Sequence, residues 1–265
     1  MIRKGLNMMK LVRQTFLLLW SLILTFPAFA AESPEPVKGN MVMFVGVDIS
    51  GSFKSTHYYE DSIKFLAHYI YGHLHGIEGL EPLNSLFVGS IGGAKPDEPK
   101  TFHPIQTFAY KNIDEIEKEL HKIFPKNVTN KFTDYNAFFK QVTEFSQNKK
   151  LVMKPITVVM LSDGVPDAPK VNGKHDFRYF DLKSLENLSR NVVIRLLYTT
   201  ATVGSDWQNK VPRKRVKIWT QDAVVMAGWK AKDIMLEGKP IREQKRFFSW
   251  VKDNVDFPVR AKRVD

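Results

Sequence analysis

The chain has 265 residues, a length that fits one large domain or two small ones. Its 43% of hydrophobic and 25% of charged residues are ordinary values for a globular protein. The formal net charge is +11. The sequence contains no cysteine, which excludes disulfide bonds, cysteine-bound metals and a lipid anchor on a processed cysteine.

The first 30 residues have the pattern of an export signal. Residues 1–14 carry four basic residues and no acidic one, residues 15–27 are almost wholly apolar, and a small-x-small site, Ala28-Phe29-Ala30, follows. This pattern is typical of a cleaved secretory signal. An uncleaved membrane anchor is the alternative, although the apolar run is shorter than the ~20 residues that a spanning helix needs. We therefore expect an exported protein, periplasmic or secreted, and a bacterial one because small extracellular domains of eukaryotes are often cross-linked by disulfides.

The rest of the chain is expected to form one α/β domain. Residues 31–40 are polar and are expected to be a linker, residues 41–258 the domain, and residues 259–265 a basic tail. Strand-like apolar runs occupy 42–49, 85–91, 106–110, 156–162, 191–200 and 216–220, and helical periodicity occupies 59–70, 113–123, 135–142, 182–188 and 241–255. Strands that alternate with helices indicate a mainly parallel sheet with helices on both faces. Residues 222–240 show no clear pattern.

Three oxygen-bearing side chains lie at alternate positions at the carboxyl end of the first predicted strand. Asp48, Ser50 and Ser52 face the same way if the backbone stays extended. In open parallel sheets, ligands bind beyond the carboxyl ends of the strands. Oxygen ligands without nitrogen or sulfur suit a hard cation. Capping of the following helix is the alternative role, since serine and aspartate favour cap positions.

Two later segments carry oxygen ligands to the same kind of position. The strand over 156–162 ends in Ser162-Asp163-Gly164, and Asp163 comes beside Asp48 if this strand neighbours the first one. Thr133 precedes the predicted helix over 135–142 and can supply a further hydroxyl.

The order of these three segments resembles a known family. The sequence DISGS at 48–52, a later threonine ahead of an amphipathic helix, and a strand that ends in SDG are similar to the metal-ion-dependent adhesion site (MIDAS) of von Willebrand factor type A (VWA) domains. The resemblance implies a Rossmann-like, three-layer fold. It also implies that five side chains surround one divalent cation, Mg²⁺ first and Mn²⁺ or Ca²⁺ as alternatives: Asp48, Ser50, Ser52, Thr133 and Asp163.

The resemblance further implies a binding protein. One coordination position is left for a glutamate or aspartate of a protein partner, in adhesion or in the assembly of an envelope or extracellular complex. We expect no enzyme, because the sequence has no GxSxG elbow, phosphate loop or HExxH motif. The alternatives are a metal-independent scaffold that uses the basic run 210–217, and a metal-dependent hydrolase.

Other charged groups have ordinary explanations. His68, His73 and His75 lie near the end of a predicted helix, where polar and cationic side chains are common. The basic run 210–217 is expected to be a solvated loop, with contact to an anionic envelope surface as its alternative role. Nucleic acid is not an expected partner. The charged loop 165–177 is a candidate for a partner surface of its own.

Overall fold

The computed structural model of the protein describes residues 35–95 and 98–258. The expected signal at 1–30, the first part of the expected linker and the tail at 259–265 lie outside the described residues. The strands are β1 (Met41–Asp48), β2 (Leu83–Ile91), β3 (His103–Pro104), β4 (Ile156–Leu161), β5 (Lys170–Val171), β6 (Lys174–His175), β7 (Val192–Thr199) and β8 (Lys217–Asp222). The α-helices are α2 (Gly51–Lys54), α3 (Tyr58–Leu74), α4 (Ile113–Ile123), α5 (Tyr135–Asn148), α6 (Lys183–Glu186), α7 (Ala201–Lys210), α8 (Ala223–Ala227) and α9 (Lys245–Asn254). Short 3₁₀ helices cover Ile77–Gly79, Ile105–Thr107, Phe177–Tyr179, Gly228–Lys230 and Ile241–Glu243.

Six of the described strands form one sheet in the order β3-β2-β1-β4-β7-β8. All neighbouring pairs are parallel except β2 and β3, which are antiparallel. The parallel strands β1 and β4 lie side by side in the middle, with Val47 opposite Leu161. The carboxyl ends of β1 and β4 therefore meet at one edge of the sheet, as the sequence predicts.

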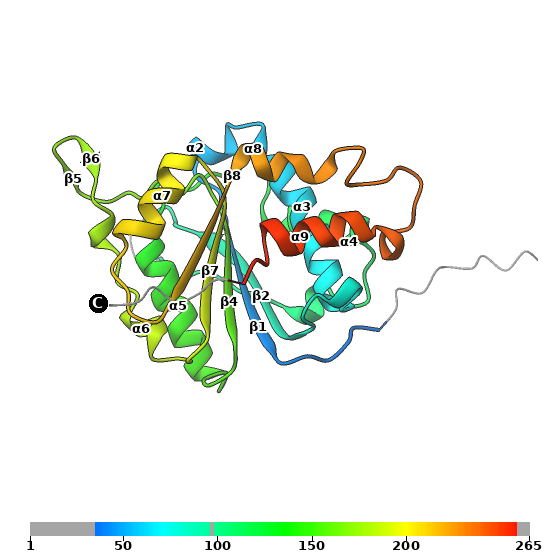
Figure 1. Ribbon diagram of the computed structural model, residues 1–265. Helices are drawn as coiled ribbons and strands as arrows, with labels where there is room; N and C mark the ends of the chain where they lie inside the picture. The colour runs from blue at the N-terminus through cyan, green and yellow to red at the C-terminus, as the bar shows by residue number, and fades with distance from the viewer. Residues whose placement is uncertain (1–34, 96–97, 259–265) are drawn as a thin grey trace, which may run out of the picture. The chain divides into compact units, whose positions relative to one another are not determined.

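Helices cover both faces of the sheet (Figure 1). The odd-numbered residues of β1 pack with α3, α4, α8 and α9, while its even-numbered residues pack with α5, α6 and α7. Both sets of β1 residues are buried, which explains why this strand is continuously apolar. The predicted three-layer α/β fold with a mainly parallel sheet is confirmed.

A glycine in β1 sets the distance between α5 and the sheet. A Cβ atom at Gly46 would lie 2.6 Å from the ring of Phe138 and 2.7 Å from Ile91. Without a side chain at this position, Phe138 packs directly on the strand. The N-terminus of α5 is thereby held close to the end of β1.

Some elements differ from the sequence predictions. The strand predicted over 106–110 is wrong, because the antiparallel edge strand lies at His103–Pro104 and a 3₁₀ helix follows at Ile105–Thr107. Helix α7 was not predicted, since its sequence is polar and only Gly204 and Trp207 are buried. The unassigned segment 222–240 contains α8, which Asp222 caps by accepting hydrogen bonds from two backbone amides.

The last described residues are held against β7 by a buried ionic cluster. Arg195 of β7 is 8% exposed and donates hydrogen bonds to the carbonyls of Val255 and Phe257. The carboxylate of Asp256 lies 3.4 Å from Arg195 Nε and 3.1 Å from His73 Nε2.

The described helices include none that is long and apolar enough to span a membrane.

Candidate metal site

Asp48 is the buried centre of the carboxyl edge of the sheet. Its side chain has no exposed surface, and its two oxygens accept hydrogen bonds from Ser50 N at 2.8 Å and from Ser162 Oγ at 2.6 Å. Burial raises the pKa of Asp48 to about 6, against the effect of these hydrogen bonds, and the charge of Asp163 adds to the rise. A buried carboxylate of this kind is destabilised when it is charged and gains from a cation beside it.

The two serines of the DISGS sequence extend the polar cluster from Asp48 toward solvent. The hydroxyl oxygens of Ser50 and Ser52 lie 3.1 Å apart, Ser50 is buried and Ser52 is exposed. Ser50 is also the N-cap of α2, where its Oγ accepts a hydrogen bond of 3.5 Å from Phe53 N. Ser50 therefore has the helix-capping role that was the alternative expectation. Because its hydrogen bond to Phe53 N is long, its hydroxyl can also bind a cation.

The loop before α5 places Thr133 at the same edge. Asn130 donates its backbone amide to Ile49 O at 2.9 Å and its side-chain amide to Ile91 O at 3.1 Å, which ties the loop to the ends of β1 and β2. A Cβ atom at Gly92, whose φ is +73°, would lie 1.8 Å from the carbonyl oxygen of Phe132. Only glycine permits this approach, and Thr133 follows directly as a buried residue.

Asp163 follows β4 at the same edge of the sheet. It is half-buried, and its carboxylate accepts a hydrogen bond of 3.0 Å from Val165 N, which fixes a local turn. Its charge acts on the pKa of both Asp48 and Tyr135. The structure therefore brings Asp48, Ser50, Ser52 and Asp163 to one edge and sets Thr133 beside them.

Three residues at this edge were not predicted from the sequence. Tyr135 Oη donates to Ser162 Oγ at 2.6 Å, and Ser162 in turn donates to Asp48. Asp167 accepts a hydrogen bond of 2.6 Å from Thr133 N. Ser162 stands next to Asp163 in the SDG motif and could have been included on that ground. Asp167 follows in an irregular loop, where no periodicity relates it to the site.

The oxygen atoms suit a hard cation. Neighbouring ligands of an octahedral Mg²⁺ lie about 2.9 Å apart, because the metal–oxygen bonds are about 2.0–2.1 Å long, and the hydroxyls of Ser50 and Ser52 are 3.1 Å apart. Among the described residues, no three His, Cys, Asp or Glu side chains are grouped so as to hold a metal ion. A cation at this edge would therefore depend on the serine and threonine hydroxyls together with Asp48 and Asp163.

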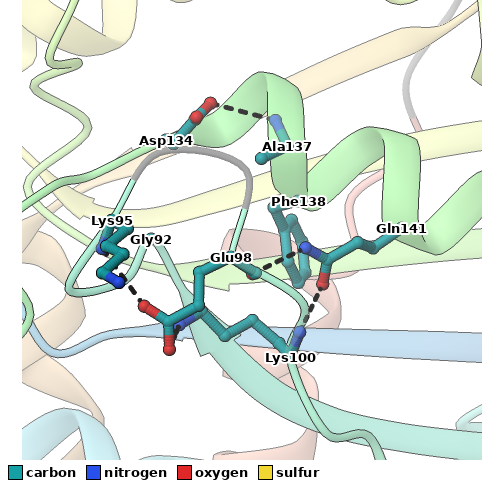
Figure 2. A pocket seen from close by; sticks show the side chains of 8 residues that line it. All are labelled: Gly92, Lys95, Glu98, Lys100, Asp134, Ala137, Phe138 and Gln141. Atoms are coloured by element: carbon teal, nitrogen blue, oxygen red, sulfur yellow. Dashed lines mark hydrogen bonds and ion pairs between the residues drawn. The ribbon is translucent and has the colours of Figure 1, made fainter.

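In the loop after β2, Glu98 and Lys100 contact Gln141 of α5 and narrow a depression beside the candidate metal site (Figure 2). Glu98 accepts hydrogen bonds from the amides of Ala94 and Lys95 and pairs with Lys100 at 3.1 Å, while Gln141 of α5 bonds the backbone of Glu98 and Lys100. The space between them is about 10 Å³, hardly enough for one water molecule. This depression offers no room for a small organic ligand.

A larger hollow lies at the opposite edge, where the strands begin. It measures about 680 Å³, and its lining includes Met41, Arg195, Lys217, Phe257 and Pro258. This hollow is thus separated from the predicted metal site by the length of the strands.

The other charged groups of the sequence have structural roles. His73 is buried between Glu81 O and Asp256, and the described residues contain no zinc-like cluster around it. In the basic run 210–217, the guanidinium of Arg213 bonds to two nearby carbonyls, and that of Arg215 bonds to Glu186 O. The run therefore connects α7 to β8 and is held to α7 and α6 by these hydrogen bonds.

Solved structures with similar folds include several VWA-type proteins. Proximal thread matrix protein 1 of the mussel byssus matches with 15% identity and a TM-score of 0.42, over 73% of this chain and 47% of that one. A further structure of the mussel protein has a zinc-occupied MIDAS motif. The SpRpn10 VWA domain matches with 12% identity and a TM-score of 0.38, over 70% and 89% of the two chains. The pilus adhesin SpaC from Lactobacillus rhamnosus GG matches with 12% identity and a TM-score of 0.42, over 84% and 32%.

The strand order and the helices on both faces of the sheet define the fold. The chain has a three-layer α/β fold with a mainly parallel sheet. At these identities and TM-scores the likeness shows nothing about function, and the chain spans about half the length of the mussel protein. No protein-family model and no curated protein matches the sequence.

Proposed function

We propose that this protein binds a partner protein through a divalent cation at the carboxyl edge of the sheet. The observation that carries the proposal is the buried Asp48 carboxylate beside the paired hydroxyls of Ser50 and Ser52. Asp48 and Ser50 would hold the cation from within the site, while Ser52 lies at its exposed side. Thr133 and Asp163 would complete the protein ligands.

The chemistry of the donor set explains why a partner would be needed. Two carboxylates and three hydroxyls supply five oxygens and leave one position of an octahedral cation without a protein ligand. A glutamate or aspartate oxygen from a partner would then be a strong further ligand. Mg²⁺ is the proposed cation because all donors are oxygens, and Mn²⁺ or Ca²⁺ are the alternatives.

Titration with Mg²⁺, Mn²⁺ and Ca²⁺, followed by calorimetry, tests the metal half of this proposal. We expect one cation to bind the protein, and we expect the Ser52→Ala and Asp48→Asn variants to bind it at least tenfold more weakly. The Ser205→Ala variant, changed in an exposed serine of α7, is the control and should bind as the parent does. Equal cation binding by all variants would refute the proposed site.

The partner half is tested by affinity capture from the native envelope, with Mg²⁺ or with EDTA. A partner that is retained only with Mg²⁺, and not by the Asp48→Asn variant, supports bridging by the cation. A partner retained equally with EDTA favours the metal-independent scaffold. The basic run 210–217 is a weak candidate for that scaffold, because two of its guanidinium groups bond within the fold.

Two features favour a binding protein over a metal-dependent hydrolase. The large hollow lies at the opposite edge of the sheet, and the depression beside the metal site is too small for a substrate. Export to the periplasm or the exterior remains part of the proposal, and its support is the signal-like pattern at 1–30. Microsequencing of the mature protein from its native host tests that part.

A further inference from the structure

The loop after β4 forms an arm that stands out beside the candidate metal site. We define the arm as residues 165–176; it contains the antiparallel hairpin β5–β6, in which Lys170 pairs with His175 and Val171 with Lys174. The two residues at its tip, Asn172 and Gly173, have φ angles of +52° and +76°. These angles are typical of the tight turn that Asn-Gly favours in hairpins. Figure 1 shows the hairpin projecting beyond α7, on the side of the sheet edge that α2 occupies.

The base of the arm is fixed to the metal site. Thr133 N donates to the carboxylate of Asp167 at 2.6 Å, and Asp167 N donates to Thr133 O at 3.3 Å. Trp207 Nε1 donates to Gly164 O at 2.9 Å, just before the arm begins. Phe177 is buried directly after the arm ends. Both ends of the arm are therefore anchored, and one of them is anchored on a predicted metal ligand.

The exposed lysines of the arm form no ion pair within the described part of the chain. Lys170 and Lys174 are exposed, and no carboxylate of the described residues lies within 4 Å of their ammonium groups. Lys131, which is exposed two residues before Thr133, likewise has no acidic partner in the described part of the chain. By contrast, Arg178 and Lys210 nearby are paired with Asp176 and Asp206.

Apolar side chains accompany these lysines. Val165 is 36% exposed, Val171 47% and Phe132 38%. Phe132 is adjacent to Thr133 and Val165 is two residues from Asp163, while Val171 lies in the hairpin. An exposed mixture of apolar side chains and unpaired cations next to a site for a carboxylate is suited to a protein segment that is acidic and partly apolar.

We propose that the arm is a second contact region for the same partner and selects an acidic segment of it. The inference rests on the proposed function, since the carboxylate at the cation sets where the segment begins. Further acidic residues of the segment pair with Lys170, Lys174 and Lys131, and an apolar residue packs on Val171. The hairpin is held at both ends, so little conformational freedom is lost when the segment binds.

Two fluorescent peptides test the inference directly. The first carries a single glutamate among serine, glycine and valine residues, and the second is the same peptide extended by a run of glutamates. In Mg²⁺ at low salt, we expect the extended peptide to bind about tenfold more tightly, because two or three exposed ion pairs contribute together. The advantage should disappear in high salt, which screens exposed charges.

Two double variants test whether the lysines of the arm, and not the net charge of the protein, cause the preference for the extended peptide. We expect Lys170→Glu with Lys174→Glu to remove the advantage of the extended peptide while leaving metal titration and the circular dichroism spectrum unchanged. Lys232→Glu with Lys239→Glu makes the same change of net charge at exposed lysines beyond α8 and should retain the advantage. If the arm variant keeps the advantage, or if the parent binds both peptides equally or fails to bind the extended one, the inference is overturned.

The same experiment distinguishes failure of the proposed function from failure of the inference about the arm. Binding of the single-glutamate peptide that persists in EDTA would refute bridging by a cation. The difference in affinity between the two peptides would still test whether the arm selects acidic segments. Vesicles containing phosphatidylglycerol are a further probe. Vesicle binding that requires Lys170 and Lys174, without any preference for the extended peptide, would overturn the inference in favour of an anionic lipid surface.

Discussion

Asp48 is costly to the fold when no cation is present. Burial places its carboxylate in surroundings that favour the neutral form, and the hydrogen bonds from Ser50 and Ser162 offset only part of that cost. Under the proposed function, the charged Asp48 carboxylate lowers the stability of the metal-free protein and would be stabilised by the bound cation. The buried charge that would favour cation binding thus lowers the stability of the metal-free fold, and such a trade-off is common at functional sites.

The Asp48→Asn substitution should stabilise the metal-free protein at neutral pH. The pKa rises from 3.8 to about 6 on folding, which corresponds to at most about 3 kcal/mol. Because the folded-state pKa is raised, the difference between variant and parent should be absent below pH 3.8, grow as the pH rises, and be complete above about 6. Chemical denaturation with EDTA at several pH values measures it. A variant that is less stable than the parent at pH 8 would contradict the role given to burial.

Protons should compete with the cation at the same carboxylate. A metal ligand must be deprotonated, so affinity is expected to fall about tenfold for each pH unit below the pKa of about 6. Calorimetric titrations with Mg²⁺ at pH 8, 6 and 5 check this dependence. Affinity that stays constant from pH 8 to 5 would show that Asp48 is not a ligand.

At the level of elements, Gly92 joins the end of β2 to the loop that carries Thr133. The Gly92→Ala substitution should lower stability by about 2 kcal/mol or more, because its φ is positive and the new Cβ would meet Phe132 O. Cation affinity should fall as well, since Thr133 would be displaced. Gly228→Ala is the control, because its φ is −70° and nothing lies within 4 Å of the added atom. Equal effects of the two substitutions on cation affinity would show that the loop does not position the site.

The strands that carry the site could be predicted because both faces of the sheet are covered. Strands β1 and β4 are continuously apolar, and each ends abruptly in polar residues, so the pattern gives both their positions and the edge where Asp48 and Asp163 meet. Helix α7 could not be found in the same way, since it buries only one large side chain, Trp207. Its beginning depends on a local cap, in which Val203 N bonds to Thr200 Oγ1 at 3.2 Å.

The arm shows that a local signal can be overlooked inside a charged loop. The Asn172-Gly173 pair between short runs is a strong hairpin signal, and the structure has a hairpin there. The contact between Asp167 and Thr133 could not be predicted, because it joins two irregular loops far apart in the sequence. Periodicity describes regular elements, whereas such a contact depends on the position of the whole sheet edge.

At the scale of the whole molecule, the ionic cluster around Asp256 holds the end of the described chain on the sheet. Burial alone would raise the pKa of Asp256, but His73, Arg195 and Tyr69 outweigh it and hold that pKa below its ordinary value. Asp256→Asn should cost about 3 kcal/mol at pH 7, because the buried Arg195 loses its counter-charge. Asp253→Asn, at an exposed position of α9, should change stability by less than about 0.5 kcal/mol.

The cost of losing Asp256 should depend on pH in a defined direction. Since the folded-state pKa is lowered, its contribution is present above the ordinary value of 3.8 and is lost as the pH falls below that value. Thermal unfolding of parent and variant at pH 7, 4 and 3 measures the difference. If the two proteins still differ at pH 3 as much as at pH 7, the cluster does not act through the charge of Asp256.

Met41, Phe257 and Pro258 line the same hollow at the edge where the strands begin. The described part of the chain therefore enters and leaves on the side away from the candidate metal site. A bulky label placed on this side of the molecule should therefore leave the candidate metal site and the arm accessible to a partner.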